Sequence, residues 1–440
     1  MIHDVLVTAN TIDAALTQLH DLCTVFEGSE TVGYDQQGEV FAETFDGLHD
    51  GLFGFVIQRT GGFVKDDDIG LLIKSASNTD ALTLAAREAD TAFANNCLVL
   101  LGPAFDGISD LGLLRSLPDA LVVDLQDIGA RFYTYASTVG GVLEAAGRAG
   151  KKVLIANKEP LVMMGPEMMR EAALSGATVI PLDSEHNAVL QCLPRSCREE
   201  LIICPTTPST SRLEEHGIEK VILTASGGPF LELPTEELDN VTPEQAAAHP
   251  KWSMGKKISI DSATMMNKGL ELIEACALFS IKPNRVEIVV HPQSIVHSLV
   301  EYSDGSLLAQ MANPDMRIPI VNALGYPDRI SSGSERLNVG QLGILEFRDP
   351  DERHYPCLRL AREVAETGGT APVILNAANE IAVDAFCSGR IRFTQISEFV
   401  DRTLQAFPVQ IRRDLETVLE VDLNTRRVTK DLIMSASGTS

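Results

Sequence analysis

A chain of 440 residues is longer than one hydrophobic core usually supports, so two or three domains are expected. Hydrophobic residues make up 45% of it, but aromatic residues only 5%, which argues against a base-stacking surface for single-stranded nucleic acid. The formal net charge of −25 repels nucleic-acid phosphates and anionic lipid. A phosphate-bearing ligand would therefore need a local cluster of donors.

The first residues, Met-Ile-His-Asp, lead into a short apolar run without the basic residues or cleavage site of a secretory signal. The apolar stretches are shorter than the ~18 residues that a membrane span needs. We therefore expect a cytoplasmic protein with no membrane or nucleic-acid partner. The eight cysteines form no Cys-x-x-Cys pair, which favours free thiols over a disulfide framework.

The first 150 residues predict few elements. Residues 6–22 suggest the end of a strand followed by a helix, and residues 97–101 and 120–125 suggest buried strands. Residues 32–68 mix glycine, aspartate and aromatic residues without a sustained period, so we predict no element there.

From about Thr178 onward, short apolar runs alternate with helical patterns. The runs ATVIPL, KVILTA and RVEIVV are typical of strands in sheets that helices cover, which is α/β architecture. Residues 325–350 are rich in Gly, Pro and Ser and predict a linker. Beyond them, CLRLAREVAETG and NAANEIAVDAFCSG have apolar residues at three and four spacing and end at glycine, which predicts amphipathic helices.

Three carboxylates are candidate ligands of a divalent cation. Asp183 and Glu185 lie just after the apolar run TVIPL, and Glu271 lies in a helical pattern. Mg²⁺ and Mn²⁺ prefer oxygen ligands, which carboxylates at a strand end and on a helix can supply while leaving positions for substrate. An Asp-x-Glu pair in a loop is also commonly just solvated, and the residues alone leave both interpretations open.

A second group has the chemistry of a phosphate site. Ser226 lies in a Ser-Gly-Gly turn, and Ser262 is expected at the start of a helix with Asn267 and Lys268 one to two turns further on. Such turns and helix starts offer N–H groups to an anion. Each residue also has a purely structural alternative: Ser262 as an N-cap, and Lys268 as the surface ion-pair partner of Glu271.

The only tryptophan, Trp252, lies beside His249 and Met254 in a segment bounded by proline and glycine. Such a segment is a candidate lid that closes over a substrate and excludes water. A lone tryptophan is more commonly a core anchor, although the polar residues around this one suit burial poorly.

Six motifs, in order, resemble the pattern of the 1-deoxy-D-xylulose 5-phosphate reductoisomerase family. They are IANKE (155–159), LDSEH (182–186), TASGGPF (224–230), HPKWSMGKKISIDSATMMNKGLELIEA (249–275), HPQSIVHSLVEYSDGSLLAQMANPDMRIPI (291–320) and LNAANEIAVDAF (375–386). Six ordered motifs are far more specific than a lone glycine motif.

The resemblance implies a homodimeric, NADPH-dependent enzyme of the non-mevalonate isoprenoid pathway with a phosphosugar substrate. The reaction would rearrange and reduce 1-deoxy-D-xylulose 5-phosphate to 2-C-methyl-D-erythritol 4-phosphate. A bound Mg²⁺ or Mn²⁺ would polarise the substrate ketone and acidify the neighbouring hydroxyl, and hydride from NADPH would reduce the resulting aldehyde.

The resemblance also implies a role for individual residues. The metal ligands would be Asp183, Glu185 and Glu271. The residues for substrate and catalysis would be Lys158, Ser184, Glu185, Ser226, His249, Trp252, Ser262, Asn267, Lys268 and Glu271. The phosphate would be held by Ser226, Ser262, Asn267 and Lys268. The residues for the cofactor would be Asn157, Glu159, Met254, Gly255 and Met316.

The N-terminal region departs from the family pattern. Members open with a strand and a glycine-rich turn, G-x-T-G-x-x-G, that lets backbone approach the cofactor pyrophosphate. No such turn is found here: residues 4–19 look like the family's second strand and helix, and the glycines of residues 102–112 are wrongly spaced. Two smaller departures are Pro160 after the ANKE run and Lys251 where the lid usually has asparagine.

Residues 120–138, ALVVDLQDIGARFYTYAST, resemble instead a motif of exo-acting muramidases, and the reductoisomerase pattern resumes near Ala136. We interpret this stretch as a substituted or recombined segment. The main alternative to an active reductoisomerase is a catalytically incomplete homologue or chimera that binds metal and phosphosugar without productive NADPH binding. A glycoside hydrolase, the third hypothesis, rests on this one motif.

The predicted fold is α/β with three domains. Residues 1–177 would form an altered or incomplete Rossmann-like NADPH-binding domain, and residues 178–324 an α/β catalytic domain for metal and substrate, with a lid at 226–257. The linker 325–350 would lead to a small C-terminal helical domain at 351–440.

Overall fold

The computed structural model describes residues 152–203, 211–248, 255–412 and 414–437, together with two strands at 97–101 and 120–124. Several predictions lie outside the described residues. They concern the strand and helix at 6–22, the glycines of 102–112, and the segment with His249, Lys251, Trp252 and Met254.

Four parallel strands form the first sheet, in the order β1-β2-β3-β4. They are β1 (Cys97–Leu101), β2 (Ala120–Asp124), β3 (Lys152–Ile155) and β4 (Thr178–Pro181). The apolar runs at 97–101, 120–125 and 177–182 are thus confirmed as strands. Because Ile155 at the end of β3 pairs with Pro181 at the end of β4, the chain leaves both strands at the same edge of the sheet.

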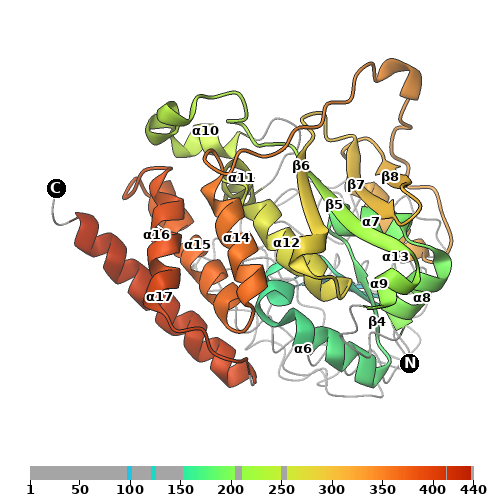
Figure 1. Cartoon of the computed structure of the whole chain (residues 1–440), viewed down its shortest axis with the longest axis horizontal. Coiled ribbons are helices and arrows are strands. Elements are labelled where there is room, and N and C mark those ends of the chain that lie inside the picture. The colour runs from blue at the N-terminus through green and yellow to red at the C-terminus, as the bar shows by residue number, and fades with distance from the viewer. Residues whose placement is uncertain are drawn as a thin grey trace, which may run out of the picture.

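The second sheet is mixed, in the order β6-β5-β7-β8. Its strands are β5 (Ile218–Ala225), β6 (Val286–Val290), β7 (Val296–Tyr302) and β8 (Leu307–Met311). β5 and β6 run parallel, whereas β7 is antiparallel to both β5 and β8. The runs KVILTA and RVEIVV therefore form neighbouring strands, and Figure 1 shows this sheet with α7, α8 and α13 on one side of the molecule.

Helices and short 3₁₀ turns connect and cover the strands. They are α6 (Glu159–Ser175), α7 (Ser184–Cys192), α8 (Arg195–Ile203), α9 (Ser211–Glu215), η3 (Thr235–Asn240), α10 (Pro243–Ala247), α11 (Lys256–Ala263), α12 (Met266–Leu278), η4 (Pro283–Arg285), α13 (Arg317–Gly325) and η5 (Val339–Gln341). Pro160 is the second residue of α6, where a missing N–H costs nothing because the first N–H groups of a helix have no intrahelical partner.

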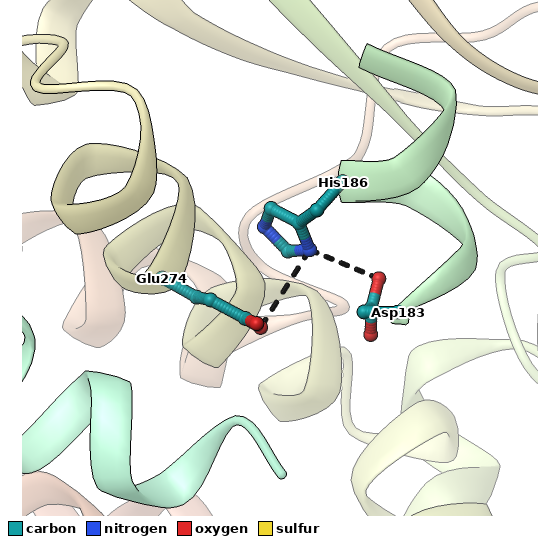
Figure 2. Close-up of side chains that lie close together, drawn as sticks. All are labelled: Asp183, His186 and Glu274. Atoms are coloured by element: carbon teal, nitrogen blue, oxygen red, sulfur yellow. Dashed lines mark hydrogen bonds and ion pairs between the residues drawn. The ribbon is translucent and has the colours of Figure 1, made fainter. Parts of the chain in front are cut away.

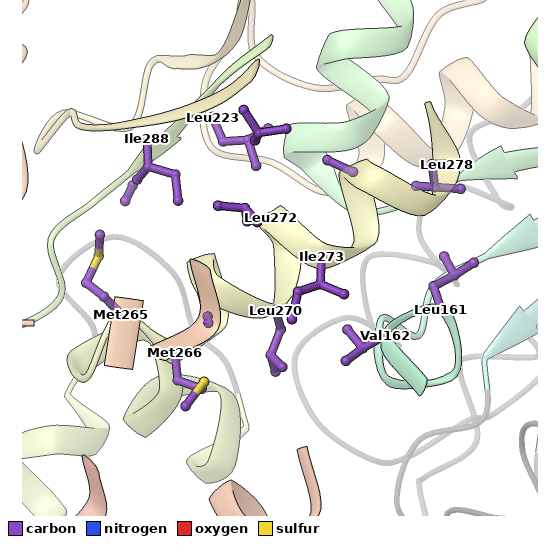
Figure 3. Close-up of a cluster of buried hydrophobic side chains, with 14 of the residues drawn as sticks. Leu161, Val162, Leu223, Met265, Met266, Leu270, Leu272, Ile273, Leu278 and Ile288 are labelled. Carbon is purple, nitrogen blue, oxygen red and sulfur yellow. The ribbon is translucent and has the colours of Figure 1, made fainter. Parts of the chain in front are cut away.

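Helix α12 lies near the centre of the view in Figure 1, and Figure 3 shows buried hydrophobic side chains on it. Its side chains Leu270, Leu272 and Ile273 are buried and belong to one hydrophobic cluster with residues of β3 to β6 and the C-terminal helices. A Cβ on Gly269 would stand 2.4 Å from the Cβ of Ala361, so only glycine allows the helix carrying Ala361 to pack this closely. The core therefore fixes α12 tightly.

The helix predicted to start at Ser262 begins elsewhere. α11 starts at Lys256 and places Ser262 in its last turn, and α12 starts at Met266. The two helices are separate because Met265 adopts a left-handed conformation, with φ of 60°, which interrupts the hydrogen-bonding pattern. The expectation that Ser262 stands at a helix start was therefore wrong.

Four helices complete the chain: α14 (Pro356–Thr367), α15 (Ala371–Cys387), α16 (Gln395–Ala406) and α17 (Leu415–Ser437). Gly368 caps α14, and α15 ends just before Gly389, which has a φ of 67°. The two amphipathic helices predicted here are confirmed, and the fold is mixed α/β. No helix among the described residues is long and apolar enough to cross a membrane.

Candidate metal and substrate site

Three carboxylates converge between α7 and α12. Asp183 caps α7, since its Oδ1 accepts a hydrogen bond from the Glu185 N–H at 3.1 Å, and Glu271 reaches the same place from α12. Ligand oxygens of Asp183, Glu185 and Glu271 all lie within 4.8 Å of one another. Their side chains are only 10%, 16% and 1% exposed. The alternative of an Asp-x-Glu pair solvated in a loop is therefore wrong.

Two lysines lie among these carboxylates. Lys158 follows β3 at the edge where β4 also ends, and its Nζ is 3.0 Å from Asp183 Oδ2, 3.0 Å from Glu271 Oε1 and 2.9 Å from Asn267 Oδ1. Lys268 Nζ is 3.4 Å from Glu185 Oε1 and also pairs with Glu271. Because Lys268 is only 6% exposed, the Lys268–Glu271 pair is buried, and the surface ion-pair alternative is wrong.

The charges in this cluster depend strongly on one another. Burial alone would lower the pKa of Lys158, but Asp183 and Glu271 hold it well above its ordinary value. Burial also opposes the ionisation of Asp183, yet Lys158 and His186 hold its pKa well below the usual range. Burial and the neighbouring carboxylates raise the pKa of Glu185 to about 7, against the effect of Lys268. The site therefore holds more acidic groups than its two lysines neutralise.

His186 and Glu274 lie next to Asp183 (Figure 2), and neither was singled out from the sequence. His186 Nδ1 is 3.0 Å from Asp183 Oδ1 and 3.6 Å from Glu274 Oε2, and its Nε2 is 2.9 Å from the Glu271 carbonyl oxygen. Because both ring nitrogens face acceptors, the imidazolium form satisfies the geometry. A signal was present: His186 follows Asp183, and Glu274 follows Glu271, by three residues on one helix face.

Asp183, His186 and Glu274 also have the spacing of a possible metal group. A metal-bound histidine needs a nitrogen lone pair, however, whereas both nitrogens of His186 are placed to donate. Burial alone would lower the pKa of His186, but Glu274 and Asp183 together raise it to about 9. One ring nitrogen of His186 thus contacts the Asp183 carboxylate and the other the Glu271 backbone carbonyl, which orients both residues.

The carboxylate cluster fits a hard divalent cation. Asp183, Glu185 and Glu271 supply the oxygen donors that Mg²⁺ and Mn²⁺ prefer. Glu271 Oε2 is buried, and the Lys268 ammonium lies directly beside it. A buried carboxylate oxygen is costly unless a cation lies next to it, so this position suits positive charge.

The Ser226 turn packs against the end of α11. Gly227 and Gly228 have φ of 83° and 69°, and the Gly228 N–H donates to Ser226 Oγ at 3.1 Å. A Cβ on Gly228 would lie 2.8 Å from the Ser262 carbonyl oxygen, so glycine is required there. The structure therefore brings the turn with Ser226 onto Ser262.

Asn267 and Lys268 are the second and third residues of α12 and are not one to two turns inside a helix that starts at Ser262. The orphan N–H groups of a helix start are thus those of α12. In this structure both side chains face the carboxylates: Asn267 contacts Lys158 and Glu271, and Lys268 contacts Glu185 and Glu271.

A cavity of about 970 Å³ lies beside the Ser226 turn. Its lining includes Ser226, Gly228, Phe230, Leu233, Gln245 and Ala248. Most of the lining residues belong to the predicted lid 226–257, whose residues 249–254, with His249, Trp252 and Met254, are outside the described part. The volume is sufficient for a phosphosugar-sized ligand.

The described residues of the cofactor set come from several elements. Asn157 lies just after β3, Glu159 is the first residue of α6, and Gly255 caps α11. Lys257 Nζ is 3.0 Å from Glu159 Oε1, so the first turns of α6 and α11 lie together. Met316 lies at the start of α13, partly buried against the core.

The position of Asn157 and Glu159 suits a dinucleotide. Open parallel sheets bind ligands at the carboxyl ends of their strands, which is where these two residues lie. Ser184, of the substrate set, is the first residue of α7 and donates to Glu185 Oε2 at 2.7 Å.

Three family models match the chain. The model described as 1-deoxy-D-xylulose 5-phosphate reductoisomerase C-terminal domain matches residues 179–279, and DXP reductoisomerase C-terminal domain matches residues 311–428. Residues 113–186 match the model described as Exo-beta-N-acetylmuramidase NamZ, N-terminal. This match confirms the predicted resemblance of residues 120–138 to muramidases.

The solved structures that resemble the fold include two reductoisomerases with bound NADPH. A crystal structure of DOX-P reductoisomerase in complex with NADPH, fosmidomycin and magnesium is 37% identical, with a TM-score of 0.68, and the match covers 82% of this chain and 96% of that one. The 1-deoxy-D-xylulose 5-phosphate reductoisomerase from Zymomonas mobilis in complex with NADPH is 35% identical, with a TM-score of 0.63 and coverage of 80% and 95%.

Reductoisomerases of several bacteria are similar to this chain in sequence. The 1-deoxy-D-xylulose 5-phosphate reductoisomerase of Pseudomonas savastanoi pv. phaseolicola is 55% identical over 282 residues, which are 64% of this chain and 68% of that protein. The enzyme of Stutzerimonas stutzeri is 54% identical over 284 residues, or 64% and 69% of the two chains. Because the match to these enzymes is this long and this identical, the chain belongs to the 1-deoxy-D-xylulose 5-phosphate reductoisomerase family.

Proposed function

We propose that the chain catalyses the NADPH-dependent rearrangement and reduction of 1-deoxy-D-xylulose 5-phosphate to 2-C-methyl-D-erythritol 4-phosphate, in the non-mevalonate isoprenoid pathway. The observation that carries this proposal is the convergence of Asp183, Glu185 and Glu271 within 4.8 Å, in a chain of the reductoisomerase family. Relatives crystallised with magnesium, fosmidomycin and NADPH support the same metal, substrate class and cofactor.

The metal ligands are Asp183, Glu185 and Glu271. A divalent cation bound there would polarise the substrate ketone and acidify the neighbouring hydroxyl. Lys158 keeps Asp183 and Glu271 in place through its two 3.0 Å contacts and carries its positive charge toward the substrate oxygens. Ser184, hydrogen-bonded to Glu185, adds a hydroxyl beside the substrate backbone.

The substrate phosphate is held by Ser226, Ser262, Asn267 and Lys268. The turn at Ser226 and the end of α11 at Ser262 lie against each other. The first N–H groups of α12 follow Ser262 within a few residues of the chain. Lys268 supplies the positive charge that a chain with a net charge of −25 needs at an anion site. His249 and Trp252 close the lid over the substrate and exclude water.

The cofactor residues are Asn157, Glu159, Met254, Gly255 and Met316, of which the two methionines line the nicotinamide pocket. NADPH supplies the hydride when it is bound. The chain divides into an altered, Rossmann-like cofactor domain (1–177), a catalytic domain (178–324) with its lid (226–257), a linker (325–350) and a helical domain (351–440). The parallel sheet β1 to β4 and the helices α14 to α17 support this division.

The functional unit is a homodimer that pairs through β8. This strand is at the edge of the second sheet, and Leu307, Leu308 and Met311 are 52%, 49% and 37% exposed. An apolar edge strand of this kind readily pairs with another chain, and a second copy offers the same strand about a twofold axis. Sedimentation velocity of the chain and of a Leu308→Lys variant tests this: the dimer should become a monomer.

The activity is tested by following NADPH absorbance with the purified chain, 1-deoxy-D-xylulose 5-phosphate and Mn²⁺. We expect NADPH oxidation that requires both the sugar and the metal. A catalytically incomplete homologue is the second candidate, favoured by the muramidase match at 113–186 and by the absence of the glycine-rich turn from the sequence. If the sugar phosphate binds in calorimetry while NADPH neither binds nor is oxidised, the incomplete homologue is correct.

A further inference from the structure

Lys257, in the first turn of α11, joins two carboxylates from different elements. Its Nζ is 3.0 Å from Glu159 Oε1 at the start of α6 and 3.0 Å from Asp261 Oδ2 one turn further along α11. Glu159 and Asp261 are 14% and 2% exposed, so both carboxylates are largely buried, whereas the Lys257 side chain is 31% exposed. Lys257 has no role in the proposed chemistry.

The C-terminal helices fix Asp261 from the other side. Asn379 on α15 is fully buried, and its Nδ2 donates to Asp261 Oδ1 at 2.8 Å. The two oxygens of Asp261 thus contact two different elements, Lys257 through one and α15 through the other. A continuous line of polar contacts runs from α15 through Asp261 and Lys257 to Glu159.

Helix α15 is itself held by α17. Arg426 on α17 contacts Glu380 Oε2 at 2.5 Å and Asp422 Oδ2 at 2.8 Å, and Asn376 donates to Glu380 Oε1 at 3.1 Å. The Lys257 bridge is therefore anchored to a pair of packed helices and not to a loop.

Charge-assisted contacts of this type fix the distance and the relative direction of the groups that they join, which apolar packing does not. Replacing a buried ion pair by apolar residues is often neutral or stabilising, so such a pair adds little net stability. The two contacts of Lys257, at 3.0 Å each, are charge-assisted, however, and together they favour one arrangement of the partners. The elements held here are the first turns of α6 and α11, which adjoin Asn157 and Gly255 of the cofactor set.

We propose that Lys257 is a positioning residue, which sets the spacing between the first turns of α6 and α11, with α15 as its anchor. It thereby holds Asn157, Glu159 and Gly255 in register for the nicotinamide end of NADPH. The inference rests on the proposed function, because it assumes that this chain binds NADPH.

The test compares Lys257→Met with Lys257→Arg, which keeps the charge, in the full-length chain. Lys220→Met is the matched control: Lys220 also pairs with a glutamate, Glu287 at 3.3 Å, but on the exposed surface of the second sheet. Three quantities are measured: the calorimetric Kd for NADPH, the separate KM values for NADPH and sugar phosphate, and amide exchange of the peptide containing Val162 without ligands. The Val162 N–H makes the first backbone hydrogen bond of α6, to the Lys158 carbonyl at 2.9 Å.

We expect Lys257→Met to weaken NADPH binding about 10-fold, the lower end of the effect of outer-shell partners on a bound group. Exchange at Val162 should become faster, and the KM for the sugar phosphate should change less than about 2-fold. Lys257→Arg should recover most of the affinity, and Lys220→Met should match the parent.

Two negative results have different meanings. If the parent binds NADPH and Lys257→Met binds it equally well with unchanged exchange at Val162, Lys257 positions nothing. An equal rise in both KM values with a lower melting temperature would show a general structural role and also overturn the proposal. If the parent itself does not bind NADPH, the proposed function fails, and the inference fails with it.

Discussion

The two sides of α12 bury opposite kinds of side chain. One side carries Asn267, Lys268, Glu271 and Glu274, whose charges and dipoles meet Lys158, Glu185 and His186 across the site. The other side packs Leu270, Leu272 and Ile273 into the hydrophobic cluster that Figure 3 shows. The apolar side gains free energy by burial, roughly 2 kcal/mol for each side chain, whereas the polar side costs free energy unless every charge has a partner.

This difference explains how the carboxylate cluster is held together. Mutual repulsion among Asp183, Glu185 and Glu271 would push α7 and α12 apart if α12 were free to move. Gly269 allows α12 to pack closely on α14, and the lysines partly neutralise the carboxylates. The apolar side thus holds in place a carboxylate cluster that suits a cation. Substitutions can weaken the carboxylate cluster and the apolar packing separately.

The largest effect is expected from Glu271→Gln, which removes a metal ligand from the polar side without changing its shape. We predict a loss of roughly 100-fold or more in kcat/KM, beyond what loss of an outer-shell partner gives. Thermal unfolding with and without Mn²⁺ provides the second measurement. The parent should gain stability from the metal and the variant should not, because only a ligand bound to the folded state stabilises it. If Mn²⁺ stabilised the variant as much as the parent, Glu271 would not be a metal ligand.

A smaller effect is expected from Gly269→Val on the apolar side, because the new Cβ would stand 2.4 Å from the Ala361 Cβ. Overpacking should lower the free energy of unfolding by about 2 kcal/mol, measured by urea denaturation. Gly340→Ala is the control, since its Cβ would be 3.5 Å from the nearest atom, Asn338 Oδ1. Equal stabilities of the two variants would mean that α12 is not tightly held by α14.

The third effect is a pH dependence, and it concerns His297 on β7. Burial, together with the positive charges of Lys268 and His291, lowers the pKa of His297 to about 4, although its hydrogen bonds to the Ala312 and Asn313 backbone act the other way. Between pH 6.5 and 4 the unfolded chain therefore binds a proton that the folded chain does not. This contribution to stability is full above pH 6.5 and is lost as the pH falls to 4, by about 1 kcal/mol per pH unit.

Urea denaturation of the parent and His297→Gln between pH 4.5 and 7 measures this contribution. The glutamine variant should show a shallower loss of stability on acidification. His216→Gln is the control, because His216 pairs with Glu200 near the surface. The same pH slope in the parent and His297→Gln would contradict the prediction.

Local patterns predicted the regular elements well. Helices α14 and α15 follow from apolar spacing and a terminal glycine, and strands β4 to β6 from short apolar runs. One helix starting at Ser262 was expected, and the break between α11 and α12 was missed because the left-handed backbone of Met265 has no sequence signal in a non-glycine residue.

The candidate site was predicted in its residues but not in its contacts. Asp183, Glu185 and Glu271 were chosen from their residue types and from family motifs. Their two structural alternatives, a solvated pair and a surface ion pair, could be discarded only once burial was known. His186 and Glu274 were missed although each lies three residues after a candidate ligand, because this spacing does not show which groups the two side chains face.

By itself, the sequence determined the family, the alternation of strands and helices, and the acidic and basic residues available for chemistry. Such features depend on local spacing and residue type. Only the tertiary structure decided which charges meet: Lys158 and Glu271 are 113 residues apart in the chain, yet in contact. A ligand set, a buried ion pair and the bridge at Lys257 all depend on distances between elements, which arise from packing and cannot be read from neighbouring residues.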